Sequence, residues 1–137
     1  MNRYRLLLKQ VNVSVIDNDL LQARVALESP GKIFVGLSVG KGGKEIELQL
    51  VVEATIDAIS QAITRPIKFF PSSVLIKEIA ENNKRFVVVL LKTDYFIEPV
   101  GESIELLGAC QISSSEAEAA VRAVLDATNR TISRLLR

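Results

Sequence analysis

The sequence contains no histidine and a single cysteine. Without histidine the chain cannot form a Ser–His catalytic pair, and it lacks the nitrogen ligand that metal sites use most often. A lone thiol, Cys110, cannot form an internal disulfide. Because a catalytic thiolate needs a neighbouring base or a lowered pKa, Cys110 is expected to pack as a small apolar residue of a strand. We therefore predict no catalytic residues, no metal site and no cofactor.

The sequence also lacks long apolar runs, and its net charge is small. Apolar residues make up 48% of the chain, yet no window approaches the roughly 20 apolar residues that a membrane span needs. Leu6–Leu8 is too short for the core of a signal peptide, so a reducing, cytoplasmic location is expected. The net charge of +1 gives only weak long-range attraction to nucleic acid or acidic membrane. The apolar surplus favours an oligomer interface, and the expected partner is a second copy in a homodimer.

Two stretches of the chain resemble one another. Val52–Thr64 reads VEATIDAISQAIT and Val121–Ser133 reads VRAVLDATNRTIS, with Val, Ala, Asp, Ala and Ile in step. Each copy lies downstream of an apolar–Gly–small pattern, FVGLS in the first half and LLGAC in the second. The repeat predicts a single domain made of two related halves, about residues 1–65 and 66–137, which share one core.

Alternating apolar residues predict three strands in the first half. Tyr4–Leu8 and Val11–Val15 alternate with opposite parity, which predicts one strand with a bulge near Lys9–Gln10. The next two strands are expected over Leu21–Leu27 and Ile33–Val39. A turn with Asn18 separates the first pair, and a type II turn with Pro30 and Gly31 separates the second.

The second half repeats this order. Strands are expected over Val74–Ile79, Phe86–Leu91 and Ile104–Ile112, with a hairpin turn at Glu81–Lys84 and a longer loop at Thr93–Ser103. Phe86–Leu91 reads FVVVLL, an unbroken apolar run that favours a strand buried on both faces. If both helices cover one face of its sheet, the second half or another subunit must cover the other.

Each set of strands is followed by a helix. The first is expected over Glu45–Thr64, because apolar residues form one stripe with three- and four-residue spacing and Arg65–Pro66 ends it. In the second, Ser113 and Glu116 form a capping-box pattern. The doubled order predicts an α+β fold, an internal duplication of a βββα unit with pseudo-twofold symmetry, antiparallel sheets and two long helices.

Gly40–Lys44 reads GKGGK just before the first helix. Glycine N–H groups, the helix N-terminus and two lysines favour anion binding, so Lys41, Gly42, Gly43 and Lys44 are the candidate ligand-binding residues. The spacing is not that of the nucleotide-binding P-loop, and no Ser or Thr follows Lys44. The alternative is a flexible connection between strand and helix.

Two pairs of residues occupy equivalent places in the repeat. Asp57 and Asp126 are expected on solvated helix faces, with Asp126 beside arginines at four-residue spacing. This position favours a structural role over paired carboxylates in acid–base chemistry. Gly36 and Gly108 are expected to permit a close backbone approach or a bulge.

Two further segments are candidate contact surfaces. The long loop carries Tyr95, Phe96 and Ile97, which either contact a partner or fold back over the core. The second helix becomes basic toward its end, with Arg122, Arg130, Arg134 and Arg137. Few aromatic residues accompany these arginines for base stacking, and cations late in a helix also stabilise its dipole.

The doubled βββα order and the glycine-rich loop before an Ala–x–x–Asp–Ala helix resemble the regulatory domain of 2-isopropylmalate synthase and related enzymes. The matching residues are Gly40, Gly42, Gly43, Ala54, Asp57 and Ala58. In that family the domain dimerises and senses a small end-product at its pseudo-symmetric interface. The resemblance covers nearly the whole chain in architecture, although the glycine spacing differs and the catalytic barrel has no counterpart. It implies a dimeric α+β fold and no particular ligand.

Three functions follow from these patterns. The first is a non-enzymatic cytoplasmic module that dimerises and senses a small molecule or scaffolds a partner. The second is a small enzyme or an anion-binding protein that uses Gly40–Lys44. The third is nucleic-acid binding through the C-terminal arginines, which salt should weaken steeply. The duplication, the apolar surplus and the missing catalytic set favour the first.

Overall fold

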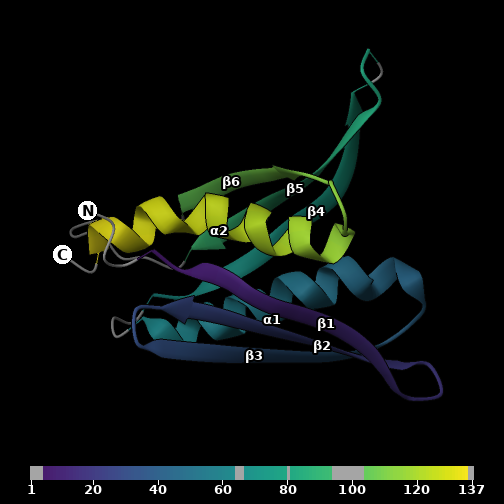
Figure 1. Cartoon of the computed structure of the whole chain (residues 1–137), viewed down its shortest axis with the longest axis horizontal. Helices are drawn as coiled ribbons and strands as arrows, with labels where there is room; N and C mark the ends of the chain where they lie inside the picture. Colours follow the sequence, from purple (N-terminus) through teal and green to yellow (C-terminus); the bar gives the residue numbers. More distant parts are fainter. Residues whose placement is uncertain (1–4, 64–66, 80, 94–103, 136–137) are drawn as a thin grey trace.

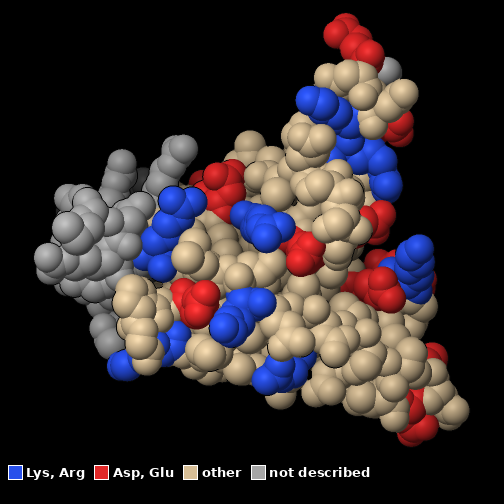
Figure 2. Space-filling view, in the orientation of Figure 1, with Lys and Arg blue, Asp and Glu red and all other residues tan. Residues whose placement is uncertain are grey.

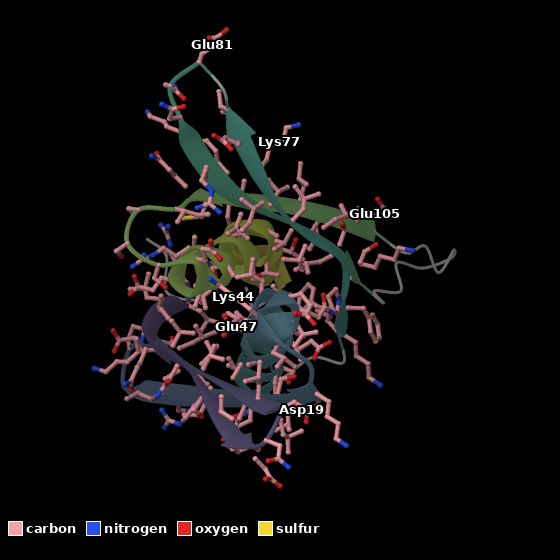
Figure 3. All side chains as sticks on the ribbon, turned by 90° about the vertical axis from the view of Figure 1, so that its right-hand side faces the viewer. Asp19, Lys44, Glu47, Lys77, Glu81 and Glu105 are labelled. Atoms are coloured by element: carbon pink, nitrogen blue, oxygen red, sulfur yellow. The ribbon has the colours of Figure 1, made fainter. Side chains whose placement is uncertain are left out.

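Six strands and two long helices form two three-stranded antiparallel sheets with the helices lying between them (Figure 1 and Figure 3). In the computed structural model, the described residues are 5–63, 67–79, 81–93 and 104–135. The strand order is β1-β2-β3 in the first sheet and β4-β5-β6 in the second. The predicted α+β class, with antiparallel sheets and two long helices, is confirmed.

The first half contains β1 (Leu7–Asp17), β2 (Leu20–Ser29), β3 (Lys32–Lys41), the short 3₁₀ helix η1 (Lys44–Ile46) and α1 (Glu47–Ala62). The predicted bulge is present, since the pairing of β1 with β2 shifts between Leu8 and Gln10. Gly31 has φ of 81°, the positive angle that a type II turn requires. The expected ends of the first strand and first helix, Tyr4 and Thr64, lie outside the described residues.

The second half contains β4 (Phe69–Ile79), β5 (Lys84–Thr93), β6 (Ile104–Gln111) and α2 (Glu116–Leu135). β4 begins five residues before the predicted start at Val74. Its first part includes Pro71, which the fold accommodates because β4 is an edge strand and the pairing shifts between Pro71 and Ser73. A bulge therefore lies near the start of the first strand in both sheets.

The cap of α2 differs from the prediction. The N–H of Glu118 donates to Oγ of Ser115 at 3.2 Å, and α2 begins at Glu116. Ser115 and Glu118 have the same three-residue spacing as the predicted pair Ser113 and Glu116, displaced by two residues. The predicted capping residue was therefore wrong. The Glu118 carboxylate accepts a hydrogen bond from Oγ of Ser114 at 3.0 Å, where a capping box would have it accept from the N–H of Ser115.

Both helices are buried over wider faces than one stripe. α1 buries Leu50, Val51, Val52, Ala54, Thr55, Ala58 and Ile59. The reason is that α1 contacts β2 and β3 on one side and α2 and β4 on the other, and α2 likewise contacts β5, β6, α1 and β1. Buried residues of both halves form one continuous cluster. Neither described helix has both the length and the apolar character needed to cross a membrane.

The strand with the sequence FVVVLL is buried on one face only. Val87, Val89 and Leu91 of β5 are fully buried under the helices. Phe86, Val88 and Leu90 alternate with them on the opposite face and are partly exposed. The prediction of burial on both faces was therefore wrong for the described part of one chain, because both helices lie on the same side of this sheet.

Candidate functional site

The predicted anion-binding loop lies between β3 and η1. The N–H of Gly42 donates to the carbonyl oxygen of Asp19 at 3.0 Å. The N–H of Gly43 donates to Oε1 of Glu45 at 3.2 Å. Two N–H groups that would hold an anion are thus engaged by oxygens of the chain itself, and one of those oxygens belongs to a carboxylate. Anion binding at this loop stays a prediction.

A cleft of about 350 Å³ lies beside this loop, between the start of α1, β4 and the start of α2. Lys44 lines it together with Glu45, Glu47 and Glu116, while Lys41 does not. Figure 3 shows Lys44 and Glu47 at this position between the two sheets. Three carboxylates around one ammonium group make the cleft unfavourable for a free anion. The loop therefore does not bring its two predicted lysines together at this cleft.

Several predicted contact residues lie outside the described part of the chain: Tyr95, Phe96, Ile97 and Arg137. The side chains of Arg130 and Arg134 are also outside the description, whereas Arg122 is exposed on α2. On the face shown in Figure 2, basic and acidic side chains are interspersed. No single basic area is visible on that face.

Cys110 lies on β6 opposite Val87, with its side chain half-buried on the face that the helices cover. Burial raises the pKa of the Cys110 thiol, and Asp126 raises it further, while the nearby Arg122 lowers it. The thiol is therefore neutral near pH 7, as expected for a packing residue. Within the described ranges, no group of three or more His, Cys, Asp or Glu residues is placed to hold a metal ion.

Gly36 and Gly108 bring the third strand of each sheet against a helix. A Cβ atom added to Gly36 would overlap the carbonyl oxygen of Ala54 in α1. A Cβ atom added to Gly108 would overlap the carbonyl oxygen of Ala123 in α2. The predicted close backbone approach is confirmed at both positions.

Asp57 and Asp126 connect each helix to the same strand. Asp57 Oδ2 accepts a hydrogen bond from the N–H of Leu37 at 3.0 Å, and Asp126 Oδ2 accepts one from the N–H of Ala109 at 3.1 Å. Both carboxylates are exposed as expected, but sequence reasoning missed their acceptor role. β3 and β6 are edge strands, so each carboxylate occupies an N–H that would otherwise be open to another strand. The recurrence of Asp after the glycine pattern was the signal available in the sequence.

The outer face of the second sheet points away from both helices and is largely apolar. We define it by the apolar residues Phe70, Leu75, Ile79, Phe86, Val88, Leu90, Leu107 and Ala109. Leu107 is 68% exposed, Phe70 47% and Leu75 46%. Exposed apolar residues gathered on one sheet face are typical of surfaces that bind a partner.

The outer face of the first sheet provides an internal comparison. β2 pairs Val25 with Gly36, and β5 pairs Val89 with Gly108, which aligns the two middle strands. The preceding residue on the outer face is Arg24 in β2 and Val88 in β5. Two positions earlier, Gln22 corresponds to Phe86, so these two positions of the middle strand are polar in the first sheet and apolar in the second. The next outer position of the middle strand is apolar in both sheets, Ala26 in β2 and Leu90 in β5. The first sheet's outer face also carries apolar residues on its edge strands, at Leu7, Ile33, Val35, Leu37 and Val39.

Comparison with protein-family models found no match, and comparison with curated proteins found no similar sequence.

Proposed function

We propose that the protein is a non-enzymatic module that forms a homodimer through the outer face of its second sheet. The observation that supports this proposal is the contrast between the two middle strands at their aligned outer positions. The same strand arrangement presents Gln22 and Arg24 to solvent in the first sheet but Phe86 and Val88 in the second. Each square ångström of apolar surface that the second copy covers would stabilise the dimer by about 25 cal/mol.

An internal duplication with approximate twofold symmetry is part of this proposal. Three features recur at matching places in the two halves. Each first strand has a bulge near its start, and each third strand has a glycine in contact with the following helix. Each helix has an aspartate that accepts a hydrogen bond from the N–H after that glycine. A common origin of the halves accounts for all three.

The finer parts of the proposal concern location and role. A reducing, cytoplasmic compartment suits a chain whose single thiol forms no internal disulfide. A sensing or scaffolding role rests on the resemblance to the regulatory domain of 2-isopropylmalate synthase. The neutral, half-buried thiol of Cys110 supports a role without nucleophilic chemistry.

The test is light scattering of the native protein across a concentration series. We expect a species of twice the 15.1 kDa monomer mass. Val88→Arg gives the second sheet the residue that the first sheet carries at this position, so it should raise the dissociation constant about 100-fold. Gln22→Arg is the matched control on the first sheet and should change nothing. Circular dichroism establishes that both variants are folded.

Two results would contradict the proposal. The first is a native protein that stays monomeric at every concentration. The second is a folded Val88→Arg variant that associates as strongly as the native chain.

A further inference from the structure

The edge strands of the two sheets differ in how their open sides are closed. The N–H of Leu37 in β3 and the N–H of Ala109 in β6 each donate to an aspartate of a helix. Just before β1, the side chain of Asn129 holds both main-chain groups of Leu6. Apart from the pairing with β5, no hydrogen bond of the described residues ends on β4. β4 therefore presents a row of unpaired N–H and C=O groups, which we call its free edge.

The cleft beside η1 opens on this free edge. Three consecutive residues of β4 line it: Val74, Leu75 and Ile76. Because neighbouring side chains of a strand point to opposite faces, a cavity that touches three residues in a row meets the strand at its edge. The cleft volume of about 350 Å³ lies within the range of ligand sites, roughly 300–1,000 Å³. Beyond the cleft, the free edge continues to Ile79 along the hairpin of β4 and β5, which projects from the rest of the molecule (Figure 1).

Carboxylates outnumber ammonium groups in the cleft. Glu47 and Glu116 are half-buried in the first turns of α1 and α2, whereas Lys44 and Glu45 are exposed. Carboxylates suit these two helix positions, because a helix N-terminus carries partial positive charge. Arg85 pairs with Glu116 at 3.1 Å, while no ion pair within the described ranges involves Glu47. A ligand with positive charge therefore complements the cleft, above all near Glu47.

The remaining wall of the cleft is mostly apolar. Leu48 of α1 and the inward-facing Val74 and Ile76 of β4 supply it. A lysine or arginine side chain suits such a site, because its carbon stem can lie along the apolar wall while its charged end reaches a carboxylate. A strand directs every second side chain to the same face, so an extended segment paired with β4 presents alternate residues to the cleft. The chemistry therefore favours an extended segment with basic residues at alternate positions.

We infer that an extended segment of a partner protein, with lysine or arginine at alternate positions, adds to the free edge of β4 and points its basic side chains into the cleft. Main-chain hydrogen bonds to β4 provide the affinity, and the carboxylates select the sequence. The segment becomes a fourth strand of the second sheet. The inference goes beyond the proposed function, because the dimer uses the outer face of this sheet rather than its edge. Leu75 alone belongs to both surfaces, through its main chain here and its side chain there.

The first test measures the binding of a fluorescein-labelled heptapeptide of alternating lysine and valine by fluorescence polarisation. We expect saturable binding to the native chain and none of a heptapeptide with glutamate in place of lysine. Glu47→Gln should raise the dissociation constant about fivefold, because it removes the carboxylate without an ion pair. Lys44→Gln should lower it about twofold, because the competing ammonium group is lost.

The matched control is Glu118→Gln. Glu118 also lies in the first turn of α2 but does not line the cleft, so its loss should change the dissociation constant by less than about 1.5-fold. Circular dichroism establishes that each variant is folded. Equal effects of Glu47→Gln and Glu118→Gln would mean that the cleft does not select the basic side chains, and the inference would be wrong.

The second test follows hydrogen exchange of the native chain by NMR, with and without the lysine heptapeptide. An added strand covers the alternate amides of β4 that point away from β5, between Val74 and Ile79. Their exchange should slow at least about tenfold when the peptide is bound. A peptide attracted by charge alone would leave these amides unchanged, so this measurement separates strand addition from general electrostatic attraction.

Several outcomes would overturn the inference. They are the absence of saturable binding, equal binding of the glutamate heptapeptide, and binding that leaves the β4 amides unprotected. If the native chain alone protects these amides increasingly as its concentration rises, a second copy occupies the free edge and the inferred partner is wrong. The proposed function is judged separately, by light scattering and by Val88→Arg, so either proposal can fail while the other stands.

Discussion

At the scale of single residues, Gly36 and Gly108 determine how closely a strand and a helix approach. Each glycine lies where an added methyl group would overlap a helix carbonyl oxygen, at Ala54 and Ala123 respectively. The overlap is with backbone atoms, which cannot rotate away as a side chain can. The strand and helix must therefore separate if either glycine is replaced.

Gly36→Ala and Gly108→Ala should each lower the free energy of unfolding by about 3 kcal/mol, because the added carbon forces the strand away from the helix. Urea denaturation measures this loss. The matched control is Gly43→Ala, where the nearest atom belongs to the movable side chain of Glu45. Equal stability of Gly36→Ala and Gly43→Ala would contradict the close packing described for β3 and α1.

Residue patterns predicted the contacts of the glycines better than those of the aspartates. A glycine within a strand indicates a close backbone approach or a bulge, since the missing side chain is visible in the sequence. The helical repeat placed Asp57 and Asp126 on exposed faces, which is correct. It could not place the N–H groups of Leu37 and Ala109 beside them, because those groups belong to strands at least 17 residues away.

At the scale of elements, the start of α2 depends on one serine. Ser115→Ala removes the acceptor for the Glu118 N–H and should lower the free energy of unfolding by about 1 kcal/mol. Thermal or urea denaturation provides the measurement. Ser113→Ala is the matched control and should change stability by less than about 0.5 kcal/mol. The opposite order of the two variants would mean that the helix begins earlier in solution.

Local signals predicted the strands and turns. Which faces of the helices and strands are buried depends instead on elements that are distant in the sequence. The turn at Gly31 and the bulge after Leu8 follow from nearby residues alone, and both are present. The wide buried face of α1 arises from α2 and β4, which no local periodicity reveals. The same applies to the predicted anion loop, where the carbonyl oxygen of Asp19 engages Gly42 from a turn distant in sequence.

At the scale of the whole molecule, the apolar run in β5 had two interpretations. Burial on both faces and burial on one face with a partner on the other produce the same sequence pattern. The positions of both helices on one side resolve this for the single chain, leaving Phe86, Val88 and Leu90 on the uncovered side. The sequence could not give this arrangement because it depends on how the two halves pack. The sequence predicted that either the other half of the chain or another subunit covers the free face of this sheet, and only the packing of the two halves leaves it uncovered among the described residues.

A homodimer whose subunits unfold together should melt at a temperature that depends on concentration, because unfolding then also separates the two copies. Each tenfold rise in concentration adds about 1.4 kcal/mol to the free energy of unfolding per mole of dimer. For two chains of this length, that corresponds to a rise in Tm of roughly 2 °C for each tenfold step. Calorimetry of the native chain over a 100-fold range above the dissociation constant provides the measurement, and the folded Val88→Arg monomer should show a constant Tm. A native Tm that stays constant over the same range would mean that the outer face of the second sheet does not stabilise the fold through association.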